Sequence, residues 1–156
     1  MLGKALSFDL TGRSWTREVE HPYFTNLVFF GSKDIKSSYW EAELFLPGSN
    51  APIGVSMEGC EAGPTAEEEA FCRRLLADPD SVFSMCRELF EPEFQKWAKS
   101  PMPQNWRDAF RVDGFSVPQK GSDLNSWDIC YFVEPAGHYF TAAFVGGKAV
   151  SVLVDG

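Results

Sequence analysis

The amino-acid sequence predicts an α+β fold, in which two central helices pack on one face of a mainly antiparallel sheet. The sheet is expected to contain N-terminal strands and a C-terminal three-stranded meander. Apolar residues alternate with polar ones at both ends of the chain, as in half-buried strands, and recur every three or four residues in the middle, as in helices. A length of 156 residues with 44% hydrophobic residues suits one packed core. We therefore expect residues 1–156 to form a single domain.

Strands are expected throughout the N-terminal third. The segments 23–30, 39–46 and 53–58 are rich in apolar and aromatic residues, and polar or Pro/Gly-rich turns separate them. Two earlier segments, SFDL and RSWTREV, flank Thr11-Gly12 and suggest a further hairpin. After the helices, the segment WRDAFRVDGFSVP is expected to be extended or to form a β-bulged strand.

Two helices are expected between these strands. Thr65 can cap the first helix and Glu68 can complete a capping box. Asp78-Pro79 ends this helix, and a second begins at Asp80 or Ser81. Pro92 predicts a kink or a restart within the second helix. A core-facing stripe on it comprises Val82, Phe83, Cys86, Leu89, Phe90, Phe94 and Trp97.

The C-terminal meander has turns that predict a register. Gly146-Gly147 suits a two-residue hairpin loop, which places Val145 opposite Lys148. The resulting core face carries Trp127, Ile129, Tyr131, Val133, Tyr139, Thr141, Ala143, Val145, Val150, Val152 and Val154. The opposite face carries Asp128, Cys130, Phe132, Glu134, His138, Phe140, Ala142, Phe144, Ala149, Ser151, Leu153 and Asp155. Because this second face is half apolar, we expect the N-terminal strands to cover it, with a partner surface as the alternative.

The same register places His138 between two carboxylates. Asp155 lies opposite it on one side, and a three-residue loop at 135–137 puts Glu134 opposite it on the other. Two carboxylates would favour the imidazolium form and raise its pKa. The trio could therefore be a charge cluster at the end of the sheet, or an acid in a pocket near His138, but no nucleophile is identified beside it.

Two further groups are candidates for binding. Glu41 and Glu43 share one strand face, about 7 Å apart along the strand, which suits either a solvated face or a pair of metal-binding or catalytic carboxylates. Trp106 follows a proline-rich loop and neighbours Arg107 and Asp108. Of the tryptophans it is the one most expected to be partly exposed, as an interface anchor, although a core position is the favoured interpretation.

Composition and motifs exclude several classes of function. The formal charge is −8, so repulsion opposes binding to nucleic acid or anionic membranes, while a basic protein could be attracted. The four cysteines, Cys60, Cys72, Cys86 and Cys130, have no C-x-x-C spacing and are expected to be reduced and structural. No nucleotide-binding, serine-hydrolase or zinc-protease motif occurs, so no cofactor, metal or catalytic residue is predicted. The first residues lack the apolar region of a signal peptide, and no apolar run is long enough to span a bilayer, which predicts a cytoplasmic protein.

Three stretches give the chain a characteristic layout: the run YWEAELFLPGSNAPIGVSMEGCEAGPTAEEEAFCRRLLADPDSVF, the segment FRVDGFSVP, and the closing WDICYFV and HYFTAAFVGGKAVSVLVDG. On these stretches, which span residues 39–156, the chain resembles small acidic bacterial proteins of uncharacterised families. Some of these are carried in polymorphic-toxin or phage-defence neighbourhoods as immunity-like proteins. The shared features are turn and strand patterns, so the resemblance implies an immunity-like role and carries over no functional residues.

The sequence thus favours a non-enzymatic, cytoplasmic interaction factor of immunity or accessory type, which binds a partner through an acidic and aromatic surface. The partner would be a basic protein or, in a homodimer, a second copy. The alternative is a small-molecule-binding or hydrolytic domain that uses a pocket near His138. The candidate interaction or pocket residues are Glu134, His138, Asp155, Trp106, Glu41 and Glu43.

Overall fold

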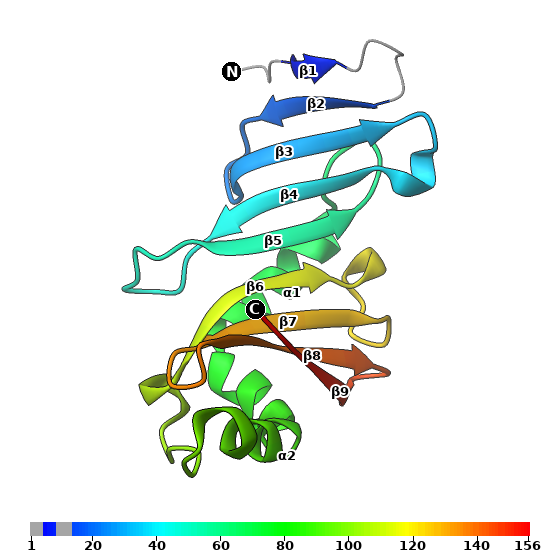
Figure 1. The fold of residues 1–156 in the computed structure, drawn as a ribbon. Coiled ribbons are helices and arrows are strands. Elements are labelled where there is room, and N and C mark those ends of the chain that lie inside the picture. Colours follow the sequence, from blue (N-terminus) through cyan, green and yellow to red (C-terminus); the bar gives the residue numbers. More distant parts are fainter. Residues whose placement is uncertain (1–4, 9–13) are drawn as a thin grey trace.

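The computed structural model describes residues 5–8 and 14–156, whose strands form one nine-stranded sheet in the order of the chain (Figure 1). The strands are β1 (Ala5–Phe8), β2 (Ser14–Val19), β3 (Thr25–Ser32), β4 (Tyr39–Leu44), β5 (Ile53–Glu58), β6 (Phe110–Val117), β7 (Trp127–Val133), β8 (His138–Val145) and β9 (Lys148–Asp155). Strands β1 and β2 pair as the predicted N-terminal hairpin, although its Thr11-Gly12 turn lies outside the described residues. The predicted α+β class, with a mainly antiparallel sheet, is confirmed.

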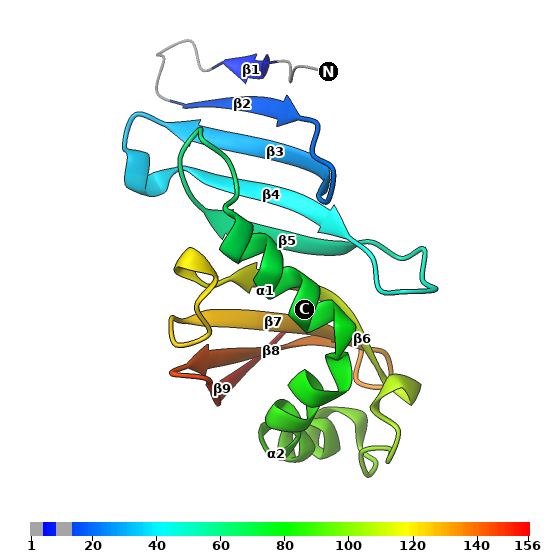
Figure 2. The ribbon, with the colours of Figure 1, turned by 180° about the vertical axis from the view of Figure 1, so that it is seen from behind.

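The one parallel pair in the described sheet joins β5 to β6. A parallel pair needs a crossover connection, and the helices α1 (Ala66–Ala77) and α2 (Pro79–Ala98) supply it on one side of the sheet (Figure 2). The junction therefore connects an N-terminal meander, β1–β5, to a C-terminal meander, β6–β9. The N-terminal strands extend the same sheet, so the expectation that they cover the second face of the C-terminal meander is wrong.

The helix boundaries follow local signals in the sequence. The Thr65 hydroxyl accepts a hydrogen bond from the Glu68 amide at 3.2 Å, and the Thr65 amide donates to the Glu68 carboxylate at 2.9 Å, which confirms the capping box. Asp78 ends α1 and caps α2 by accepting a bond from the Ser81 amide at 3.2 Å. Of the kink or restart predicted at Pro92, the restart does not occur: α2 is continuous through this exposed position.

Aromatic side chains fill the space between α2 and the C-terminal half of the sheet. Phe83 and Phe90 from α2 meet Phe110, Tyr131 and Phe140 from β6, β7 and β8, with ring centroids 4.9–6.0 Å apart. All five side chains are buried. Burial of this much aromatic surface against the strands explains why the helices hold to one face.

The register of the β7–β8 hairpin differs from the prediction by one residue. Val133, and not Glu134, lies opposite His138, so the connection has four residues, 134–137. The Gly137 amide closes it by donating to the Val133 carbonyl at 2.9 Å. A slip of one residue reverses the face of every later side chain, which places His138 on the helix side. The buried residues of β8 are accordingly Phe140, Ala142 and Phe144.

The β8–β9 hairpin contains a second departure from the predicted register. The turn at 146–147 forms as predicted, but Ala143 lies opposite Ser151, one residue farther along than expected. This irregularity compensates for the first slip, so the side chains at the end of β9 lie on the faces that the sequence predicted. Asp155 nevertheless lies opposite Tyr139 instead of His138. The core-packed residues of β9 are Ala149, Val152 and Val154.

One face of the sheet, which we call the open face, has no helix over it. In Figure 1 the helices lie behind the sheet, and β9 crosses in front of β7 and β8. The view from behind agrees with this placement (Figure 2). The sheet therefore curls toward its open face at the C-terminal end. Among the described residues, no helix is long and apolar enough to cross a membrane.

Candidate functional site

A row of polar side chains crosses the open face from β4 to β7. Glu41 lies opposite Ser56, and Ser56 lies opposite Ser116 across the parallel junction. The Ser116 hydroxyl donates to the Asp128 carboxylate at 3.1 Å and accepts from the Asp128 amide at 2.9 Å. Strand pairing therefore brings together hydroxyl and carboxylate groups that are distant in the sequence.

The next row contains two glycines in place of side chains. Glu43 lies opposite Gly54, Gly54 opposite Gly114, and Gly114 opposite Cys130. Bare backbone at the centre of this row leaves a depression of about 340 Å³ on the sheet. We call this depression the glycine trough. Its lining residues are Glu41, Ala42, Gly54, Val55, Ser56, Gly114, Phe115, Ser116, Asp128 and Cys130.

The two glycines have different reasons for lacking a side chain. A Cβ on Gly114 would lie 2.8 Å from the carbonyl oxygen of Gly54, so the close approach of β5 requires glycine there. A Cβ on Gly54 would meet nothing closer than the Asp113 carbonyl oxygen at 3.9 Å, and its φ is not in the left-handed region. The fold therefore leaves room for a side chain at Gly54.

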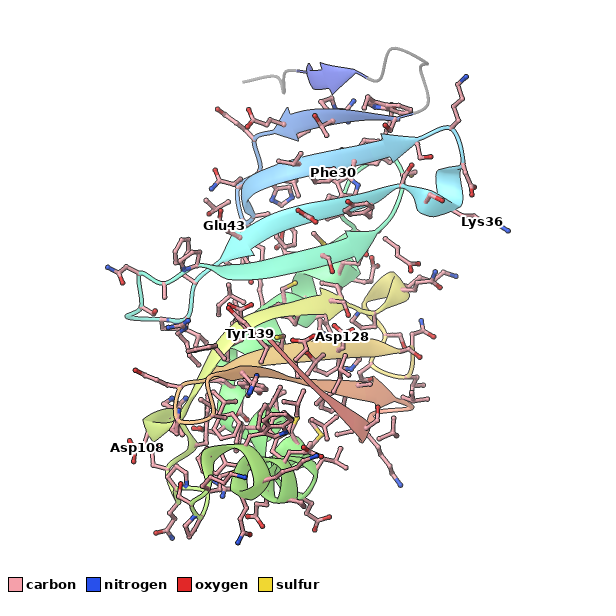
Figure 3. The ribbon with its side chains drawn as sticks, viewed as in Figure 1. Phe30, Lys36, Glu43, Asp108, Asp128 and Tyr139 are labelled. Carbon is pink, nitrogen blue, oxygen red and sulfur yellow. The ribbon has the colours of Figure 1, made fainter. Side chains whose placement is uncertain are left out.

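A second depression continues from the trough toward the connection between β3 and β4. Its volume is about 480 Å³, and it shares Glu41, Ser56 and Ser116 with the trough. Tyr39 borders it and stacks on Phe30, with ring centroids 4.9 Å apart and 7° between the ring planes. Figure 3 shows Phe30 on the open face above the region labelled by Glu43 and Asp128. The two depressions form one groove with acidic, hydroxyl and aromatic walls.

Carboxylates outnumber cations along this groove. The acidic residues on or beside it are Glu41, Glu43, Glu58, Asp113, Asp128 and Asp155. Lys36 lines the second depression, and Arg111 lies over the Phe132 ring at 5.2 Å. A curved face with this excess of negative charge attracts a cationic partner and repels an anionic one.

The Cys130 thiol borders the trough without the features of a nucleophile. Burial raises its pKa, and the carboxylates of Asp113, Asp155 and Asp128 raise it further, against a hydrogen bond with Thr141 that lowers it. The thiol is therefore protonated at neutral pH, whereas the thiolate is the reactive form of cysteine. Among the described residues, no group of three or more His, Cys, Asp or Glu side chains is arranged to hold a metal ion.

Glu41 and Glu43 share the open face, as their spacing predicts. Glu41 lines both depressions. Glu43 accepts a hydrogen bond from the Asn26 side chain at 3.1 Å. Only Glu41 of the predicted candidates therefore enters the lining of the groove.

The predicted trio around His138 does not form. Its imidazole packs against the Trp97 ring on the helix side, with centroids 4.4 Å apart. Glu134 lies in the hairpin connection, and Asp155 is at the end of β9 opposite Tyr139. The cause is the register of the β7–β8 and β8–β9 hairpins, which differs from the prediction and separates the histidine from both carboxylates.

Trp106 is a core residue. It is 6% exposed and stacks on Phe83 with ring centroids 4.8 Å apart, so the favoured core position is confirmed and its choice as a partly exposed interface residue is wrong. Its indole N–H donates to the Asp80 carboxylate at 2.7 Å. This bond satisfies the polar atom of the ring and allows the rest to be buried.

Sequence reasoning missed the partners of Glu41 in the groove: Ser56, Ser116, Asp128 and the two glycines. The alternation in IGVSME does indicate that Gly54 and Ser56 share a face. Nothing local indicates that β6 pairs with β5, because that pairing spans the two helices. Comparison of the chain with protein-family models, curated proteins and solved structures finds no match.

Proposed function

We propose that this protein is a non-enzymatic, cytoplasmic interaction factor of immunity or accessory type, whose open face binds a basic protein partner. The observation that supports this proposal is the groove itself, an acidic and aromatic surface on a sheet face without helices. Exposed aromatic side chains are enriched at interaction sites, where polar groups surround them. The charge of −8 adds long-range attraction for a cationic protein.

An exposed aromatic side chain at the groove supplies an apolar part of the interface. Tyr39 lines one end of the groove, is 38% exposed and stacks on Phe30. Single exposed ion pairs contribute only about 0.2–1 kcal/mol, so the carboxylates alone would bind weakly. Tyrosine is one of the residues in which binding hot spots are enriched, so Tyr39 is a suitable anchor beside the carboxylates.

A second copy of the chain is a poorer occupant for this face. Two open faces in contact would place carboxylates against carboxylates, and like charges across an interface oppose association. We therefore expect the isolated protein to have the monomer mass of 17.5 kDa. Light scattering coupled to size-exclusion chromatography measures this mass, and a dimer that reverts to monomer on charge reversal of Glu41 would contradict the argument.

Affinity capture with matched variants tests the proposed function. The first variant, Glu41→Lys with Asp128→Lys, reverses charge at the groove. The second, Glu88→Lys with Glu91→Lys, makes the same change of net charge on exposed positions of α2. A basic protein captured from host extract by the wild type and the α2 variant, and lost with the groove variant, supports the proposal. Equal capture by all three proteins would contradict it.

A further inference from the structure

We infer that the glycine trough receives an extended segment of the partner, with cationic side chains on alternate residues and its main chain over Gly54 and Gly114. This inference rests on the proposed function and specifies which part of the open face holds the partner. It follows from two independent features of the trough. One is the absence of a side chain at Gly54, and the other is the placement of the carboxylates.

Gly54 is the first feature. Glycine in the interior of a strand weakens it, and it often marks a site where another chain approaches closely. Gly114 has a reason within the fold, because β5 passes too close for a Cβ. Gly54 has none among the described residues, since a Cβ there would have room and its φ is ordinary. A partner main chain lying on the sheet at this point would explain the missing side chain.

The carboxylates are the second feature. Glu41 on β4 and Asp128 on β7 flank the trough from opposite sides, three strand spacings apart, which is roughly 14 Å between their backbones. One ammonium or guanidinium group cannot contact both carboxylates. Alternate residues of an extended segment lie about 7 Å apart and point the same way, so two cationic side chains can reach one carboxylate each. The segment would therefore cross the strands over the glycine pair.

The hydroxyl groups fit the same occupant. Ser56 and Ser116 are half-buried in the row between the two carboxylates. Their oxygens can accept hydrogen bonds from guanidinium N–H groups, which present five donors in a planar fork. Arginine is therefore a better fit than lysine for the cationic positions.

Peptide probes and a variant that fills the trough test the inference. The probe is a fluorescein-labelled octapeptide in which arginine alternates with serine, and its control has the same residues with the four arginines contiguous. We expect the alternating peptide to bind the wild type more tightly and to shift the NMR amide signals of Gly54, Ser56 and Gly114. Gly54→Val is expected to weaken this binding about tenfold or more, which is about 1.4 kcal/mol, without lowering the melting temperature. Ser151→Val, on the open face of β9, is the matched control and is expected to bind like the wild type.

Several outcomes would overturn the inference. They are equal binding by Gly54→Val and the wild type, equal affinity for the two peptides, and amide shifts that lie outside the trough. If Gly54→Val proves unstable, Gly54→Ala supplies a smaller group at the same place and is expected to weaken binding to an intermediate degree. A partner that is lost on charge reversal at the groove but retained by Gly54→Val would overturn this inference and leave the proposed function intact. Capture of the partner by the groove charge-reversal variant to the same extent as by the wild type would overturn the proposed function.

Discussion

Replacing Gly114 by alanine is expected to destabilise the protein, whereas the same replacement at Gly54 is expected to stabilise it. The new Cβ at Gly114 would lie 2.8 Å from the Gly54 carbonyl oxygen, which is closer than real Cβ contacts. The atom it meets belongs to the backbone of β5, so relief requires movement of a strand in the one parallel pair of the described sheet. Overpacking of this kind costs about 1–3 kcal/mol.

Alanine at Gly54 has the opposite effect because its Cβ enters open space, 3.9 Å from the nearest atom. Gly→Ala changes at compatible positions stabilise by about 0.4–1 kcal/mol, because they restrict the unfolded chain. The two single-methyl variants are therefore expected to differ by about 1.5–4 kcal/mol in free energy of unfolding. Urea denaturation followed by the fluorescence of the five tryptophans measures this difference. Equal denaturation midpoints, or a Gly114→Ala variant more stable than Gly54→Ala, would refute the conclusion that only Gly114 lacks room for a side chain.

Three further predictions concern the core, the helix cap and the acid side of the stability profile. Phe90→Ala removes a fully buried ring and is expected to cost about 3–5 kcal/mol in the same denaturation assay; a loss below 1 kcal/mol would contradict its place at the centre of the core. Thr65→Ala is expected to cost about 1 kcal/mol by loss of the capping bond, while Thr65→Ser keeps its stability. The Trp106 indole and the Arg107 guanidinium hold the pKa of Asp80 below its ordinary value. The stabilisation by Asp80 is thus fully present above the unfolded-state pKa of about 3.9 and is lost as pH falls through the folded value. The melting-temperature gap between wild type and Asp80→Asn is therefore expected to close on acidification, and a gap that widens would contradict the assignment.

Local chemistry made much of the fold predictable. The capping box at Thr65 and Glu68 and the Asp78-Pro79 break depend on residues a few positions apart, and they form as the sequence indicates. The strand pattern at 53–58 likewise depends on alternation within one segment. These features are determined before distant parts of the chain meet, so a single sequence is sufficient to predict them.

Pairing between strands was less predictable. The β7–β8 register depended on whether the connection contains residues 135–137 or 134–137. The hydrogen bond from the Gly137 amide to the Val133 carbonyl establishes the longer connection, and only the structure shows this bond. One residue of difference moved His138 from a charge cluster to a place beside Trp97. Hydrophobic alternation did not reveal the error, because both faces of β8 carry apolar residues.

The candidate site was predictable only in part. Glu41 was identifiable because it alternates with apolar residues in its own strand. Its neighbours across the parallel junction, Ser116 and Asp128, lie beyond the two helices in sequence and have no local signal that connects them with β4. The glycine pair was missed for the same reason, since Gly114 needs to be glycine only because β5 passes beside it.

The most direct test of an acidic open face as the binding surface is the affinity of the captured partner for matched charge variants. Isothermal titration with the purified partner, at low and at high salt, compares the wild type with the groove reversal at Glu41 and Asp128 and with the α2 reversal at Glu88 and Glu91. We predict that the groove reversal abolishes binding, that the α2 reversal leaves most of it, and that added salt weakens binding to the wild type. Equal loss in the two variants, or affinity that does not depend on salt, would contradict the proposed role of the open face.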